Sequence, residues 1–253
     1  MKPLPRRMPS KAAKWALRIA VFVPVLALIS ILAHRGESVD TPTFLVLLAI
    51  IALIALLALV FVFLAFRSLW VKGKRGGRRA TWALFIVAIV GAPYIYAAAL
   101  ALARPTVTDV STDLIAPPVF QTELRLLGDN AMTVVAGEIV DGYPDITGRR
   151  YNATADVILE QVLLSAEERG WEILARRGRV GANDEVFIEF AHKSRLLGMP
   201  KQIIARITDE GETTFLDLRS QSQFISHDLG SNAATIREFI ADIDFNLVGQ
   251  IVR

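Results

Sequence analysis

The sequence predicts an α+β protein in two parts: a helical membrane anchor with three transmembrane helices, followed by a soluble domain with a four-stranded antiparallel sheet packed by two helices. Residues 1–103 hold three long apolar stretches and carry 13 Lys and Arg against 2 Asp and Glu, a net charge of +11. Residues 104–253 carry 15 basic and 23 acidic residues, a net charge of −8, and mix strand-like with helix-like periodicity. That length is sufficient for one domain with its own core.

A basic tail, residues 1–14, precedes the anchor, residues 15–103. Transmembrane helices are expected at residues 15–33, 44–66 and 80–103. The middle stretch has 23 apolar residues without a charge, and at about 1.5 Å per residue it exceeds a hydrocarbon core of roughly 30 Å. Pro24 interrupts the first stretch, and Gly91 and Pro93 interrupt the third. No charged residue lies deep in any of them, which argues against an ion path.

Basic residues flank the stretches unevenly. Six Lys and Arg lie in the segment up to Arg18 and six in residues 67–79, but only Arg35 lies in the first loop. The positive-inside rule therefore places the N-terminus and residues 67–79 in the cytoplasm. Three crossings then put residues 104–253 on the periplasmic side of a bacterial inner membrane. The alternative, a cleaved signal peptide in place of the first span, leaves the soluble domain on the same side.

The soluble part begins with an extended segment, residues 104–121, and residues 131–140 form either a strand or a packed loop. A helix is expected over 154–168, with Thr154 as N-cap and Gly170 as the left-handed stop. Strands are expected at 171–177, 185–193, 202–208 and 213–222. Short turns join them, so neighbouring strands are antiparallel.

The last strand has one apolar and one polar face. Leu216 and Leu218 alternate with Asp217, Arg219 and Gln221. A closing helix follows, with Asp228 as its expected N-cap and a full apolar face, formed by Leu229, Ala233, Ile236, Ile240, Ile243 and Leu247.

Polar residues gather in two stretches that we expect to meet, because the 109–113 segment can lie against the polar face of the last strand. Paired carboxylates there could serve acid–base chemistry. The structural interpretation is favoured, since such residues also bind backbone groups, cap helices and form ion pairs. The candidate binding cluster is Asp109, Ser111, Thr112, Asp113, Asp217, Arg219, Asp228, Asn232 and Arg237.

Outside this cluster, the sequence shows no motif of a catalytic, metal or cofactor site. There is no cysteine, and the histidines, His34, His192 and His227, lack metal-ligand spacing. Neither a nucleophile motif nor a phosphate-binding glycine loop occurs. The acidic soluble half would repel phosphate backbones, so no nucleic-acid partner is expected.

Several stretches together resemble the family known as domain of unknown function 1499 (DUF1499), over roughly residues 104–245. They are DVSTDLIAPPVF (109–120), Tyr143-Pro144, Gly170-Trp171 and LDLRSQSQFISHDLGSNAATIREFI (216–240). The resemblance implies a domain often found behind membrane spans, without an established activity. Members usually carry paired Asp residues where this chain has Pro200-Lys201-Gln202, and Ser-Arg-x-Gly where it has Gln223 and Phe224. A ligand site using either feature is altered here.

Three functions are consistent with these features. The leading hypothesis is a non-catalytic inner-membrane protein that contacts the lipid bilayer and presents its periplasmic domain to an unknown envelope protein or ligand. The second is an envelope enzyme that uses Asp109, Asp113 and Asp228 as acid–base groups. The third is an accessory subunit for transport or lipid handling, which requires a cavity among the spans.

Overall fold

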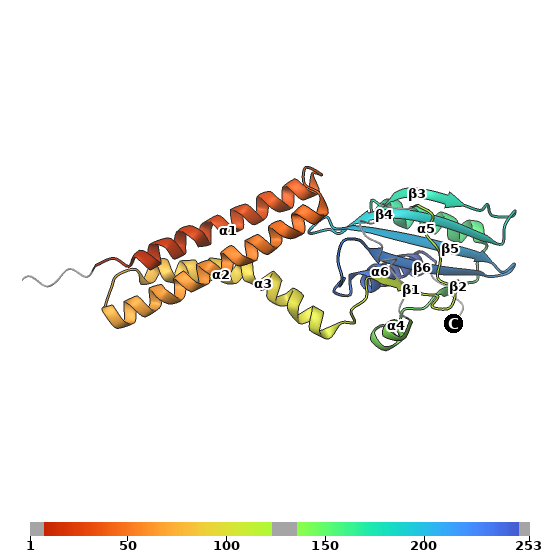
Figure 1. Ribbon diagram of the computed structural model, residues 1–253. Coiled ribbons are helices and arrows are strands. Elements are labelled where there is room, and N and C mark those ends of the chain that lie inside the picture. The colour runs from red at the N-terminus through yellow and green to blue at the C-terminus, as the bar shows by residue number, and fades with distance from the viewer. Residues whose placement is uncertain (1–7, 123–135, 248–253) are drawn as a thin grey trace, which may run out of the picture. The chain divides into compact units, whose positions relative to one another are not determined.

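A computed structural model describes residues 8–122 and 136–247 (Figure 1). The chain divides into two compact units, Met1–Ala99 and Leu100–Arg253. Each unit has its own buried core.

Three helices make up the first unit: α1 (Lys11–Arg35), α2 (Thr41–Lys72) and α3 (Gly77–Ala103), of which only α3 continues past Ala99. All three are long and apolar enough to cross a membrane. Each of the expected spans lies within one of them. Gly91 and Pro93 do not break α3, which is one continuous helix.

Small residues bring these helices together. Ala16, Ala20, Ala58 and Ala83 are fully buried between them, as expected where only small side chains allow close backbone approach in a membrane. Large apolar side chains on the remaining faces are exposed, which suits helices surrounded by lipid rather than water.

The second unit is built on an antiparallel sheet with the order β1-β6-β5-β4-β3, and β2 also pairs with β6. The fold class predicted from the sequence is confirmed, and the four expected strands correspond to β3–β6. The elements are β1 (Asp109–Ser111), α4 (Ala136–Gly142), β2 (Arg149–Tyr151), α5 (Ala155–Glu168), β3 (Glu172–Arg177), β4 (Glu185–Lys193), β5 (Pro200–Asp209), β6 (Thr214–Ser222) and α6 (Ser231–Asn246).

Two details of the prediction were wrong. The sheet has six strands in the described residues rather than four, because β1 and β2 add three residues each. Strands of that length are too short to show an alternating pattern. Residues 136–140, expected in a strand or loop, belong to helix α4, while residues 131–135 of that prediction lie outside the described range.

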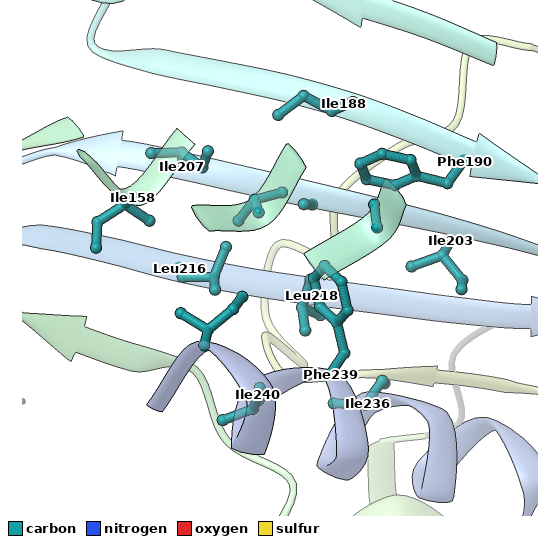
Figure 2. Close-up of a cluster of buried hydrophobic side chains, with 14 of the residues drawn as sticks. Ile158, Ile188, Phe190, Ile203, Ile207, Leu216, Leu218, Ile236, Phe239 and Ile240 are labelled. Carbon is teal, nitrogen blue, oxygen red and sulfur yellow. The ribbon is translucent and has the colours of Figure 1, made fainter. Parts of the chain in front are cut away.

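The core lies between the sheet and helices α5 and α6, which contribute Ile158, Val162, Ile236, Phe239 and Ile240 (Figure 2). The strands contribute the facing layer of Ile188, Phe190, Ile203, Ile207, Leu216 and Leu218. Trp171 joins the two sides, since its ring stacks on Phe239 with the centroids 4.5 Å apart.

Helix α5 ends where the sequence predicts. Gly170 has φ +67°, the left-handed conformation that glycine adopts without strain. The N–H of Gly170 donates to the carbonyl of Glu167, and the N–H of Trp171 donates to Ala166. This Schellman arrangement turns the chain directly into β3.

Phe239→Ala should lower the free energy of unfolding of the soluble unit by about 3–5 kcal/mol, because it empties the site under Trp171. Phe245→Ala on the same helix is the matched control, since Phe245 is 78% exposed and Phe239 fully buried. Urea-dependent pulse proteolysis of the full chain in mild detergent measures both. Equal losses would contradict the assigned core.

Candidate functional site

The sheet has a polar face opposite the one that α5 and α6 cover. On β6 it is formed by Asp217, Arg219 and Gln221, which alternate with the core residues Leu216 and Leu218. Their cross-strand neighbours on β5 are, respectively, Arg206, Ile204 and Gln202.

Residues 112–122, here named the strap, cross this polar face. The guanidinium of Arg206 donates to the carbonyl of Ala116 at 3.0 Å, and that of Arg219 donates to the carbonyl of Pro118 at 2.7 Å. The Arg219 guanidinium also lies 5.1 Å from the ring centroid of Phe120. Two arginines of the sheet therefore hold the strap by its backbone.

The end of the strap is bound at β4 and β5. The Glu189 carboxylate accepts the N–H groups of Gln121 and Thr122 at 2.6 and 2.9 Å. The Gln202 side chain donates to the carbonyl of Thr122 and accepts from Gln221. The strap thus reaches across three strands, and the polar side chains beneath it are satisfied mainly by its backbone and by one another.

One edge of β6 pairs with β1 at residues 219–221 and with β2 at residues 214–216, and Thr112 bonds to the strand between these two segments. Its N–H donates to the carbonyl of Leu218, and its hydroxyl accepts from the Leu218 N–H, both at 2.9 Å. The same hydroxyl donates to Asp217 at 2.8 Å. A threonine side chain thereby replaces a missing backbone acceptor in the ladder.

Asp109 and Arg219 form a buried ion pair. Arg219 Nη2 lies 2.6 Å from Asp109 Oδ2, and the side chains are 12% and 1% exposed. Burial raises the pKa of Asp109 above its usual value, and Arg219 opposes this only in part. Ser111 lies opposite Arg219 on the neighbouring strand, fully buried, and its hydroxyl has no partner within the described chain.

Arg206 joins two further carboxylates. Its Nη2 atom lies 2.6 Å from both Asp113 Oδ2 and Asp217 Oδ2. Burial alone would raise the pKa of Asp113, but bonds from the N–H groups of Ala116 and Ile115 and from Arg206 outweigh it, so this pKa is lowered. Asp113 therefore stays ionised and shapes the first turn of the strap.

Asp228 belongs to a different place, the beginning of α6. The sequence predicted Asp228 as the N-cap residue, but Gly230 occupies that position. Leu229 and Gly230 both have positive φ and lengthen the turn. The Asp228 carboxylate still caps the helix, since it accepts the N–H groups of Gly230 and Asn232 at 2.9 and 2.6 Å.

Asn232 fastens the start of α6 to the core face of β6. Its side-chain oxygen accepts the hydroxyls of Ser220 and Ser222, and its amide donates to the carbonyl of Thr108. Arg237 lies apart, in an exposed pair with Asp145 at 2.7 Å. Of the nine candidates, Asp109, Ser111, Thr112, Asp113, Asp217 and Arg219 come together, whereas Asp228, Asn232 and Arg237 lie elsewhere.

Sequence reasoning missed the contributions of β4 and β5 to this site. Arg206 and Gln202 alternate with the core residues Ile203, Ala205 and Ile207, so the strand period was an available signal. The sequence signal for Glu189 was weaker, because Glu189 is a single buried carboxylate in a largely apolar strand.

The arrangement can hold a segment of backbone in place, and its carboxylates are occupied in doing so. Asp109, Asp113 and Asp217 each contact an arginine, and Glu189 binds two N–H groups. Within residues 8–122 and 136–247, no group of three His, Asp or Glu residues is placed to hold a metal ion.

Residues 109–243, from β1 into α6, match the family model described as protein of unknown function (DUF1499). The chain belongs to this family. No curated protein matches it. The DUF1499 range contains the whole strap and the strands that hold it, so the motif at 109–120 coincides with the segment that crosses the sheet.

Two stretches, Pro200-Lys201-Gln202 and Gln223-Phe224, were expected to depart from DUF1499 relatives. Lys201 is 5% exposed, and its ammonium donates to the carbonyl of Ser231 and the hydroxyl of Thr235 at 2.8 and 3.0 Å. Burial lowers the pKa of Lys201 to about 8. Gln223 is also buried, and Phe224 has φ +65°.

Asp109→Leu should lower the free energy of unfolding by about 3–5 kcal/mol, because it leaves Arg219 without its carboxylate in a buried site. The double variant Asp109→Leu/Arg219→Met should lose clearly less. Arg150→Met is the control, since Arg150 and Glu210 form an exposed pair, and exposed ion pairs contribute little to stability. Additive losses in a urea double-mutant cycle would contradict the coupling.

Stability should rise between pH 8 and 10.5 through Lys201. Its pKa is about 8 in the folded chain against 10.5 in the unfolded one, so the unfolded chain binds more protons within this window. The free energy of unfolding of the wild type relative to Lys201→Met should therefore increase from pH 8 to 10.5. If the difference in free energy of unfolding between the two proteins is constant across that range, the lowered pKa of Lys201 is contradicted.

Proposed function

We propose that this DUF1499 protein is a non-catalytic binding module of the bacterial envelope, anchored in the inner membrane and presenting its soluble domain to the periplasm. The strap is the proposed contact surface for an envelope protein. The observation that carries this proposal is that the strap turns its backbone carbonyls and the Asp113 carboxylate toward the sheet while it exposes the apolar side chains of Ile115 and Val119.

The outward side of the strap is apolar. Ile115 is 99% exposed and Val119 is 64% exposed, with the exposed Ala116 between them. The carboxylate of Asp113 is turned toward Arg206 and the backbone of the strap. Large apolar side chains held out by an ordered backbone lose little conformational entropy on binding, which favours a protein contact.

A catalytic role for the carboxylates is less well supported. A general base must be free to accept a proton from a substrate, yet Asp109 and Asp217 lie beneath the strap with only 1% and 3% of their side chains exposed. Asp228 is occupied by two N–H groups of the α6 turn.

The periplasmic placement rests on charge asymmetry. The start of α1 and the loop between α2 and α3 are rich in Lys and Arg, whereas the loop between α1 and α2 contains Glu37 and Asp40. The excess of positive charge favours a cytoplasmic position for the first two segments.

Alkaline phosphatase fusions test this placement, because the enzyme is active only after export. A fusion at Pro118 should be active, and a matched fusion at Gly73 should be inactive. The reverse pattern, or an inactive Pro118 fusion that is stably expressed, would refute the periplasmic domain.

A photo-crosslinking amino acid at Ile115, in intact cells, should give one adduct of defined mass. Position 245 on α6 is the control, because Phe245 is 78% exposed but far from the strap in the sequence. Val119→Asp should reduce the adduct at 115 severalfold by placing a charge in the contact. Identical adducts at both positions, or no effect of Val119→Asp, would contradict the proposal.

A further inference from the structure

One end of the helical unit is a built basic surface. The N-terminal segment and the α2–α3 loop pair as a parallel bridge: the Arg75 N–H donates to the Met8 carbonyl at 3.0 Å, and the Ser10 N–H donates to the Arg75 carbonyl at 2.8 Å. The Ser10 hydroxyl lies 2.9 Å from that of Ser68 near the end of α2. Two basic segments, separated by most of α1 and α2, are thereby fixed side by side.

The helices themselves are locked together just below this bridge. Ala13, Ala65 and Ala80, one from each helix, are all fully buried in one contact. The hydroxyl of Ser10 also accepts the N–H of Ala13 and caps α1. The backbone carrying the basic side chains is therefore ordered, which a charge signal for topology alone does not require.

Positive charge is concentrated at this end of the unit, where no Asp or Glu occurs in residues 8–18 or 67–82. The only Asp and Glu within Met1–Ala99 are Glu37 and Asp40. They lie beyond the other end of α1, about 36 Å away for a helix of this length. The first turns of α1 and α3, whose dipoles add positive potential here, also contain no acidic residue. The basic platform consists of Lys11, Lys14, Arg67, Lys72, Lys74, Arg75, Arg78 and Arg79.

Tryptophans place this platform at the level of lipid headgroups. Trp15, Trp70 and Trp82 are 52%, 93% and 52% exposed. All three lie within five residues of the alanine contact along their helices, which corresponds to about 8 Å. Exposed tryptophans at the ends of apolar helices occupy the membrane interface. The basic side chains beyond them therefore lie among phosphates.

We propose that the basic platform is a binding surface for anionic phospholipid headgroups, organised by the bridge between Met8–Ser10 and Arg75. Its occupant is a membrane lipid with a net negative headgroup, because the surface combines an ordered set of cations with an exposed aromatic and apolar wall. Phe63, Phe66 and Trp70 form that wall beside Arg67.

Native mass spectrometry of the full chain in mild detergent tests this, with equimolar dioleoyl-phosphatidylglycerol and dioleoyl-phosphatidylcholine. The two lipids share acyl chains, so a preference reports the headgroup alone. At low salt, the wild type should retain about ten times more phosphatidylglycerol than phosphatidylcholine, since each basic residue near a surface contributes measurably to anionic lipid binding. High salt should reduce the ratio.

Two matched pairs of variants locate the effect. Neutralising Lys72, Lys74, Arg78 and Arg79 to Gln should bring the ratio close to one. Neutralising Arg176, Arg177, Arg179 and Arg195 to Gln removes the same charge from the soluble unit and should leave the ratio unchanged. Ser10→Pro, which removes the N–H bonded to Arg75, should lower the ratio about two- to threefold, whereas Ser10→Ala keeps that N–H and should lower it less.

The proposal is overturned if the wild type shows no headgroup preference, or if the two quadruple variants behave alike. Equal ratios for Ser10→Pro and Ser10→Ala would overturn the role of the bridge. These readouts are independent of the periplasmic binding function, since neither the strap nor the phosphatase fusions enter them.

Discussion

Two largely buried arginines on one face of the sheet, Arg206 and Arg219, are the constraint on which the soluble domain depends. Each is bound to a carboxylate from a strand and to a carbonyl of the strap. A guanidinium offers five donors in a rigid plane, so it can bind both at once. Strands β5 and β6 are therefore covered on both faces, by the apolar helices on one and by the strap on the other.

This polar layer specifies position more than it adds net stability. Buried ion pairs lose most of their attraction to desolvation, yet leaving one partner alone is strongly unfavourable. Any other path of the strap would leave Arg206, Arg219 or Glu189 without hydrogen-bond partners, so such paths are disfavoured. The result is a strap with a defined course, able to present Ile115 and Val119 at fixed positions.

The fold followed largely from periodicity, and the site only in part. The alternation in β6 and the apolar face of α6 predicted the layer. The 109–113 segment was expected against the polar face of β6, but residues 109–111 pair along the edge of that strand as β1, and the side chains of Asp109 and Thr112 contact Arg219 and Asp217. Arg206 and Gln202 alternate with the core residues of β5, but Ile204 lies on the same face and interrupts its polar pattern, so Arg206 was missed. The Asp228 cap was displaced because Leu229 adopts positive φ, a conformation that few non-glycine residues take and that no simple pattern signals.

The central claim, that the strap is held on the polar face by Arg206 and Arg219, is tested most directly by hydrogen exchange of residues 112–122 in the full chain. Thr112, Ile115, Ala116, Gln121 and Thr122 have bonded N–H groups, so slow exchange is predicted for a peptide covering them. Arg206→Met should speed this exchange while β6 stays protected. Exchange at the rate of an unstructured peptide in the wild type would contradict the account.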